Sequence, residues 1–124
     1  MDLAESTFQV LAGSAGFLLP ALSAGAVGGI LALANIAPQQ CINLYHAFCS
    51  GEKERSGDLQ SKIMELNTAV TRQWGVPALK AAMDFIGMYG GPARKPLMPL
   101  SGEEREQLHG LLTGFSLQPG VFEK

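Results

Sequence analysis

Residues 8–35 read FQVLAGSAGFLLPALSAGAVGGILALAN, and this stretch decides the fold of the chain. It lies within a longer run, Ser6 to Gly51, that contains no Asp, Glu, Lys or Arg. Strands of a parallel sheet are covered on both faces, so they appear as continuous apolar runs instead of alternating patterns. The stretch therefore predicts two buried strands, over 8–12 and 29–33, that are joined by a short helix over 17–23.

A membrane-spanning helix is the alternative interpretation of the same region. Residues 17–37 are about 20 mostly apolar residues, which is the length that crosses a bilayer, and Gly25 and Gly29 have GxxxG spacing. However, Pro20 and three glycines divide the region into short pieces, and no Lys, Arg or Trp flanks it closely. We therefore favour the βαβ interpretation and expect no membrane span.

The rest of the sequence predicts helices only. Apolar residues at helical spacing follow Pro38 up to Gly51, and a second such pattern covers 59–74. A third helix begins at Pro77 and is stopped by a Gly-Gly-Pro turn over 90–92, and Ser101 with Glu104 forms a capping box for the last helix. Asn35, at the end of the second strand, is expected to cap the helix that follows.

This order of elements predicts one part of a larger fold. Two parallel strands leave unpaired backbone on both edges, and a complete (β/α)8 barrel takes roughly 250 residues, whereas this chain has 124. The predicted fold class is α/β, the C-terminal part of a TIM barrel with its last two parallel strands over 1–51. A C-terminal helical segment over 52–124 follows it.

Charge and cysteine content exclude several function classes. The net charge is −2, and the nine Lys and Arg form no stripe, so we expect no nucleic-acid partner. Cys41 and Cys49 are eight positions apart on one predicted helix, about 12 Å along its axis, and cannot bridge each other. His46 and Cys49 have the spacing of half a metal site but no second pair accompanies them, and His109 is expected on a solvated face. The pattern predicts no metal and no cofactor.

Longer segments of the chain resemble a known superfamily. The residues 8–38, followed by NTAVTRQWGVPALKAAMDFIGMYGGPARKPLMPLS, resemble the C-terminal half of the dihydrodipicolinate synthase and N-acetylneuraminate lyase superfamily. The segments LAGSAG, NTAVTRQWG and MYGGPARKPL are most similar to 4-hydroxy-2-oxoglutarate aldolase. The resemblance implies a class I lyase, in which a lysine forms a Schiff base with a keto acid and a tyrosine relays protons.

The resemblance places those catalytic groups on segments that precede this part of the fold, so no catalytic residue is assigned here. An imine-forming lysine belongs at the carboxyl end of a barrel strand, and neither predicted strand contains a lysine. Lys80, in VPALKAAMD, is expected to pack its stem on a helix face. We therefore expect the isolated chain to lack aldolase activity and to be poorly soluble.

Three residues are candidates for substrate binding. Gly13 and Ile30 match family positions at the ends of the last two strands, where the glycine and the main-chain carbonyl lie close to the keto acid. Ser14 could donate a hydrogen bond to a carboxylate at the start of the following helix. Each also has a purely structural interpretation: a turn glycine, a core side chain and a helix cap.

Three function classes follow. The first is a truncated aldolase that cleaves 4-hydroxy-2-oxoglutarate to pyruvate and glyoxylate, or a relative that resembles dihydrodipicolinate synthase or N-acetylneuraminate lyase. The second is a non-catalytic protein that binds full-length subunits, and the third is a small membrane protein. Expected partners are a keto acid and either further copies of the chain or the missing barrel half. The resemblance implies a mitochondrial location, but the acidic MDLAEST is unlike a transit peptide, so a cytoplasmic location stays open.

Overall fold

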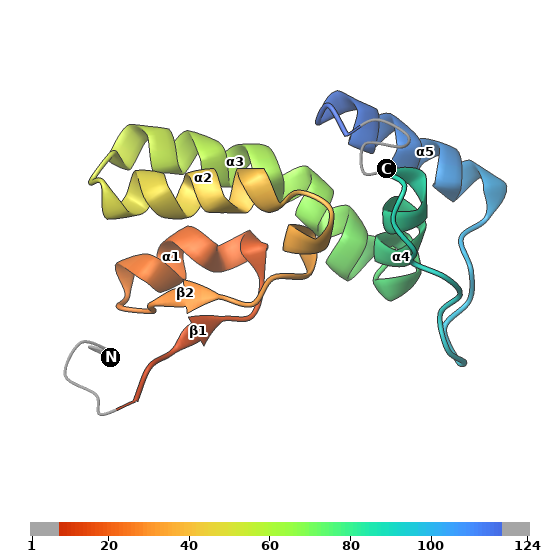
Figure 1. The fold of residues 1–124 in the computed structure, drawn as a ribbon, viewed down its shortest axis with the longest axis horizontal. Coiled ribbons are helices and arrows are strands. Elements are labelled where there is room, and N and C mark those ends of the chain that lie inside the picture. Colours follow the sequence, from red (N-terminus) through yellow and green to blue (C-terminus); the bar gives the residue numbers. More distant parts are fainter. Residues whose placement is uncertain (1–7, 118–124) are drawn as a thin grey trace. The chain divides into compact units, whose positions relative to one another are not determined.

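Two short parallel strands and the helix between them form the beginning of the structure, a computed structural model that describes residues 8–117 (Figure 1). Strand β1 (Leu11–Ala12) pairs in parallel with β2 (Gly28–Gly29). A 3-10 turn, η2 (Ala15–Phe17), and helix α1 (Leu18–Ser23) make the crossover between them. The predicted βαβ unit is therefore confirmed.

Both strands are shorter than the sequence predicts. Residues 32 and 33, expected as the end of the second strand, belong instead to the 3-10 helix η3 (Ala32–Asn35). Parallel pairing continues only as far as the Ile30 N–H, which donates to the Ala12 carbonyl at 2.9 Å. In the described part of the chain the sheet has only these two strands, so the residues after Ile30 have no neighbouring strand to pair with. The backbone then satisfies its polar groups locally, as a 3-10 turn does.

The expected cap at Asn35 is wrong. Its side-chain amide donates to the Ala32 carbonyl at 3.0 Å, within its own turn. The next helix, α2 (Pro38–Cys49), has Ala37 at its N-cap position and no side-chain cap. Pro38 begins α2, where a missing N–H costs nothing, and Gly51 follows its end with φ of 74°.

Helix α2 packs on α1 and η3 through Cys41, Leu44 and Ala47, which are buried. Both cysteines are free, as predicted, with Cys41 buried and Cys49 exposed. In residues 8–117 no helix combines the length and the hydropathy that a bilayer crossing requires.

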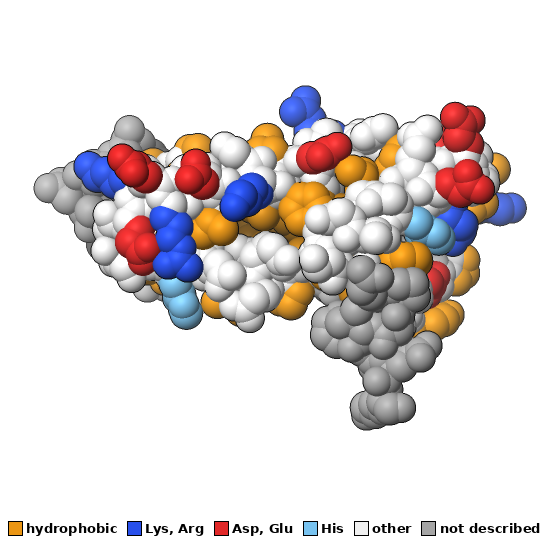
Figure 2. Space-filling model, turned by 90° about the horizontal axis from the view of Figure 1, so that it is seen from above, with side chains coloured by type: hydrophobic (Ala, Val, Ile, Leu, Met, Phe, Trp, Pro, Cys, Tyr) orange, Lys and Arg blue, Asp and Glu red, His pale blue; other side chains and the backbone are white. Residues whose placement is uncertain are grey.

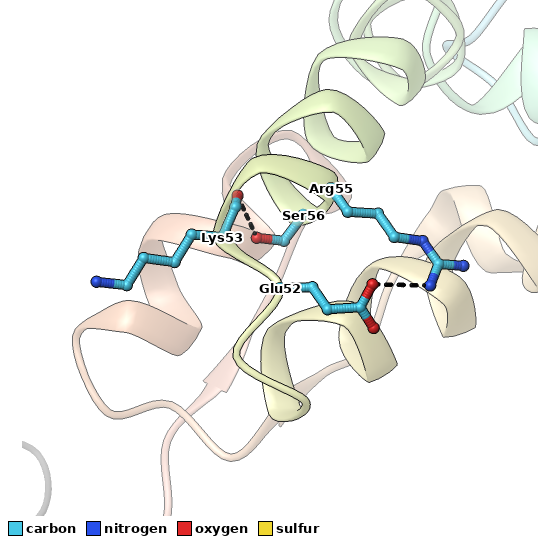
Figure 3. Close-up of polar contacts among 4 residues, drawn as sticks. All are labelled: Glu52, Lys53, Arg55 and Ser56. Atoms are coloured by element: carbon cyan, nitrogen blue, oxygen red, sulfur yellow. Dashed lines mark hydrogen bonds and ion pairs between the residues drawn. The ribbon is translucent and has the colours of Figure 1, made fainter.

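Helix α3 (Lys53–Thr68) begins six residues before the predicted start at residue 59. Its first turn is held by Ser56, whose hydroxyl donates to the Lys53 carbonyl at 2.9 Å, and by an exposed Arg55–Glu52 ion pair at 3.0 Å (Figure 3). Figure 2 shows charged side chains of both signs gathered at this end of the first unit. An exposed pair of this kind stabilises a helix by well under about 1 kcal/mol.

The chain divides into two compact units, the first ending at Glu65 and the second beginning at Leu66. The second unit contains the π-helical turn η4 (Ala69–Gln73), α4 (Val76–Phe85) and α5 (Gly102–Gly114). Helix α4 packs on both η4 and α5, and the buried side chains include Ala78, Ala82, Ile86, Leu108 and Leu112.

Two predictions for the helices of the second unit are confirmed, and one boundary is not. Pro77 lies in the first turn of α4, and the capping box of α5 is present, with Glu104 N–H donating to Ser101 Oγ at 3.2 Å. Helix α4 ends at Phe85, before the Gly-Gly-Pro turn that was expected to stop it. The positive φ of 90° at Gly87 accompanies this earlier end.

His109 was expected on a solvated face, and the structure corrects this. Its ring is half-buried and stacks on Phe85, with 4.2 Å between the ring centroids. Burial lowers the pKa of His109, the nearby charge of Arg105 lowers it further, and Glu106 acts in the opposite direction. The folded second unit therefore favours the neutral imidazole.

This arrangement predicts a pH dependence of stability. Because the folded-state pKa of His109 lies below the ordinary value of about 6.5, the unfolded state binds the proton more readily. The free energy of unfolding of the second unit is thus expected to be highest above that value and to fall as the pH is lowered through it. Urea titrations at pH 7.5 and 5.5, followed by the fluorescence of the single tryptophan, Trp74, measure this. A His109→Phe variant should lose this part of the slope, and an unchanged slope would contradict the assignment.

Candidate functional site

The turn after β1 contains two of the predicted substrate-binding residues. Gly13 is exposed, and a Cβ built on it would meet no atom within 4 Å, so the space beside it is open in this chain. Ser14 is half-buried, has an extended backbone and caps η2 by accepting the Gly16 N–H at 3.2 Å. The capping interpretation of Ser14 is therefore confirmed, and its carboxylate-binding role stays a prediction.

A residue far away in the sequence, Gln60 on α3, holds this turn. Its side-chain carbonyl accepts the Leu19 N–H at 2.9 Å, and its side-chain amide donates to the Ala15 carbonyl at 2.8 Å. Ala15 is fully buried, and Gln60 is half-buried. Gln60 could not be recognised from the sequence, since its only local signal is a polar position next to the apolar stripe of α3.

One face of the two-stranded sheet is uncovered. On the side facing α1, Ala12 is buried, and a Cβ at Gly29 would lie 3.2 Å from Leu18 Cδ1. The other side bears Leu11 and Ile30, which are 49% and 75% exposed. The predicted site residue Ile30 thus lies at the end of β2 with its side chain open. Its packing in a barrel interior stays a prediction.

An apolar groove runs beside β2 and along α2 in the first unit. Its volume is about 370 Å³. Val27, Gly29 and Leu31 line it from the strand side, and Pro38, Ile42 and Tyr45 from the helix. Tyr45 hydroxyl donates to the Val27 carbonyl at 3.3 Å, which ties the helix to the strand. Among the described residues, no Asp, Glu, Lys or Arg lines the groove, and His46 forms part of its wall.

The titratable groups near this groove do not suggest catalysis. Burial raises the pKa of the Cys41 thiol to about 11, so this thiol stays protonated at neutral pH. A hydrogen bond and a charge interaction with Cys49, together with burial, raise the pKa of Tyr45. His46 is exposed, and residues 8–117 contain no group of three metal-ligating side chains. The half metal site considered in the sequence is therefore not completed by any described residue.

Lys80 lies on α4 in the second unit and is not at a strand end. Its ammonium donates to the Gly90 carbonyl at 2.9 Å, and Asp84 accepts the Gly90 N–H at 2.8 Å. The lysine therefore has a structural role in holding the turn that follows α4. Of the other lysines, Lys53, Lys62 and Lys95 are exposed on helices or a loop, and Lys124 lies outside the described residues.

The strand ends thus offer backbone groups, a hydroxyl and apolar walls, and no described strand residue is a nucleophile or a base. Such an arrangement can bind a small acid, but it cannot form an imine. Comparison with known proteins accounts for this. The Dihydrodipicolinate synthetase family matches the chain over residues 1–114. The chain belongs to this family.

Individual relatives of the dihydrodipicolinate synthetase family match the same part of the chain. An uncharacterised DapA-like lyase of Halobacterium salinarum is 37% identical over 91% of this chain and 36% of its own length. A 4-hydroxy-tetrahydrodipicolinate synthase of Methanothrix thermoacetophila is 34% identical over 91% of the chain and 38% of its own length. The crystal structure of dihydrodipicolinate synthase from Thermotoga maritima superposes with a TM-score of 0.83 at 30% identity, over 91% of this chain and 38% of that one.

The chain therefore spans little more than a third of the length of the relatives it matches. The predicted fold class, the last part of a TIM barrel followed by helices, is confirmed by the similarity to solved dihydrodipicolinate synthase structures. Membership of a lyase and synthase family is likewise confirmed. The particular closeness to 4-hydroxy-2-oxoglutarate aldolase stays a prediction.

Proposed function

We propose that this chain supplies the last two strands of a class I lyase barrel, with Gly13, Ser14 and Ile30 forming part of the wall that binds a keto acid. The observation that carries the proposal is the family match over residues 1–114, together with a βα unit whose uncovered face bears Leu11 and Ile30. In a parallel barrel that face points inward, and active sites lie at the carboxyl ends of the strands. The turn after β1 lies at such an end.

In the proposed reaction a lysine from the preceding strands forms the Schiff base with the keto acid. The residues of this chain do not move a proton or form a bond to the substrate. The turn at 13–16 contains backbone N–H groups and the Ser14 hydroxyl, and the sequence from Ser6 to Gly51 contains no acidic residue. Such donors at a strand end suit a carboxylate. The chain's proposed contribution is therefore binding and orientation.

Two reactions of this class have support. Of the relatives named above, the Methanothrix protein is named as a 4-hydroxy-tetrahydrodipicolinate synthase and the Thermotoga protein as a dihydrodipicolinate synthase, which favours a synthase of that kind. The segments LAGSAG, NTAVTRQWG and MYGGPARKPL favour the second candidate, cleavage of 4-hydroxy-2-oxoglutarate to pyruvate and glyoxylate. Both begin from the same type of imine, so one test of imine formation applies to both.

Borohydride trapping with pyruvate, read by intact mass, tests the proposal. The 124-residue chain alone is expected to show no mass gain, because no described strand residue is a lysine. A chimera is then built in which this chain replaces the matching last third of the Methanothrix thermoacetophila synthase. The chimera is expected to gain one reduced pyruvate. A mass gain on the isolated chain, or no mass gain on a folded chimera, would contradict the proposal.

The active chimera also separates the two candidate reactions. It is assayed for formation of 4-hydroxy-tetrahydrodipicolinate and for cleavage of 4-hydroxy-2-oxoglutarate, with the unsubstituted Methanothrix enzyme as the reference. If this chain's wall favours the aldolase reaction, the ratio of the second activity to the first should rise in the chimera. A ratio equal to that of the reference would leave the synthase as the better supported candidate.

A further inference from the structure

We propose that Gln60 is a positioning residue for the substrate-binding turn at the end of β1; this rests on the function proposed above. The turn joins β1 to α1 and includes Gly13 and Ser14, the two candidates closest to the proposed carboxylate. Gln60 lies on α3, and the residues that it contacts precede it by 41 and 45 positions. It is the polar side chain that links α3 to this turn by two hydrogen bonds.

The backbone N–H groups at the start of α1 show what Gln60 contributes. Four N–H groups at the start of a helix have no partner within the helix. Here Gly16 N–H is accepted by Ser14, and Leu18 N–H by the Ala15 carbonyl. Helix α1 has Phe17 at its N-cap position, which provides no side-chain acceptor. The side chain of Gln60 accepts the Leu19 N–H instead and so completes the cap from another helix.

The Gln60 side chain binds two elements next to the turn at once. Gln60 accepts from Leu19 in α1 and donates to the Ala15 carbonyl in η2, so the two bonds attach to the helical side of the turn, one in each of these elements. A planar amide that is fixed at both of its polar ends leaves the turn little freedom to rotate about β1. Gly13 and Ser14 lie between this clamp and β1, so we expect the clamp to limit how far their N–H groups can turn.

Apolar packing alone does not explain the hydrogen bonds of Gln60. Ala15 and Leu18 are buried at 0% and 2% exposure, so apolar packing alone already holds the turn against the unit. A leucine or methionine at position 60 would satisfy that packing, but it would lose the contacts of the amide, including the one that its nitrogen donates to the Met64 sulfur at 3.6 Å. The amide adds a defined direction, which is what a binding site needs and a core does not.

The test on the 124-residue chain is amide hydrogen exchange by NMR. Gln60→Met keeps the shape of the side chain and removes the hydrogen bonds to Leu19 and Ala15, and Gln107→Met on the exposed face of α5 is the matched control. We expect Leu19 N–H protection to fall about tenfold in Gln60→Met, while amides within α2 stay unchanged. An equal loss of protection in α1 and α2 would reveal general destabilisation and would overturn the proposal, as would no change at Leu19.

A conservative variant should restore the turn at low pH, which a residue that acts only through packing would not do. A protonated carboxyl can donate and accept as the amide does, whereas a carboxylate only accepts. In Gln60→Glu the resonances of Gly13 and Ser14 should therefore differ from wild type at pH 7 and return toward it at pH 4. Resonances that stay shifted at both pH values, or that never shift, would contradict the assignment.

The link to the site is tested in the active chimera. Gln60→Met is expected to raise the pyruvate concentration for half-maximal borohydride trapping about tenfold, with the final extent of trapping unchanged. An unchanged concentration would remove Gln60 from the binding function. If the unsubstituted chimera forms no imine, the proposed function fails instead, and the amide and rescue results still decide whether Gln60 holds the turn.

Discussion

Replacing Gly90 with alanine is expected to lower the free energy of unfolding of the second unit by about 3 kcal/mol. Gly90 is buried against the backbone of α4. A Cβ at this position would overlap the Lys80 carbonyl oxygen and lie 2.6 Å from the Lys80 carbonyl carbon. These are backbone atoms of a helix and cannot rotate away, so the turn itself has to move.

Moving the turn breaks a small polar cluster. Gly90 donates to Asp84 and accepts from the Lys80 ammonium, at 2.8 Å and 2.9 Å, and Gly91 N–H reaches the same Asp84 oxygen at 3.3 Å. Each net hydrogen bond contributes about 1 kcal/mol, more where one partner is charged. The loss of these bonds adds to the overlap, which is why the expected effect is large for the addition of one methyl group.

Urea unfolding followed by Trp74 fluorescence measures the effect, because the single tryptophan lies in the second unit. Gly110→Ala is the matched control: this glycine is inside α5, and a Cβ there would meet nothing within 4 Å. The control is expected to stabilise the helix by about 0.5 kcal/mol. A Gly90→Ala midpoint equal to that of wild type would show that the turn is free to relax.

The helices could be predicted from the sequence because their signals are local. Apolar spacing after Pro38 and the Ser101–Glu104 box each lie within a few residues, and both are confirmed. The start of α3 was missed because residues 53–58 are mostly charged and contain no apolar stripe. Strand length was overestimated for another reason: an apolar run shows that a segment is suited to a sheet, but its pairing depends on neighbouring strands.

The candidate site could be predicted only in part. Gly13, Ser14 and Ile30 lie at the strand ends, where the sequence places them, but their contact with a substrate stays a prediction. The contacts that shape the site were not visible in the sequence. Gln60 is 41 and 45 positions from its partners, and the Lys80–Asp84–Gly90 cluster depends on a turn that folds back on its own helix. Such pairings arise from packing and leave no local pattern.

The second large effect concerns the uncovered face of the sheet. The double variant Leu11→Glu, Ile30→Glu is expected to raise the solubility of the isolated chain several-fold and to reduce its self-association. Both side chains are about half or more exposed, at 49% and 75%, so a carboxylate at either site stays in water. The free energy of unfolding should change by no more than about 0.5 kcal/mol. Solubility and sedimentation measurements report on this first result.

The same substitutions should have the opposite effect in the chimera. If the face points into a barrel, two carboxylates become enclosed among apolar side chains, and each unpaired buried charge costs several kcal/mol. Borohydride trapping with pyruvate should then be lost. The control is Val76→Glu with Met98→Glu, which adds equal charge at exposed apolar positions of the second unit. It should leave trapping in place.

The two results together decide what the face is for. A soluble single chain and an inactive chimera are expected only if Leu11 and Ile30 are solvent-exposed in this chain and enclosed in the assembled barrel. Trapping that survives in the double variant would mean that the face stays open to water even when the preceding strands are present. The inward orientation of β1 and β2 would then be wrong, and with it the proposal that Gly13, Ser14 and Ile30 line a keto-acid site.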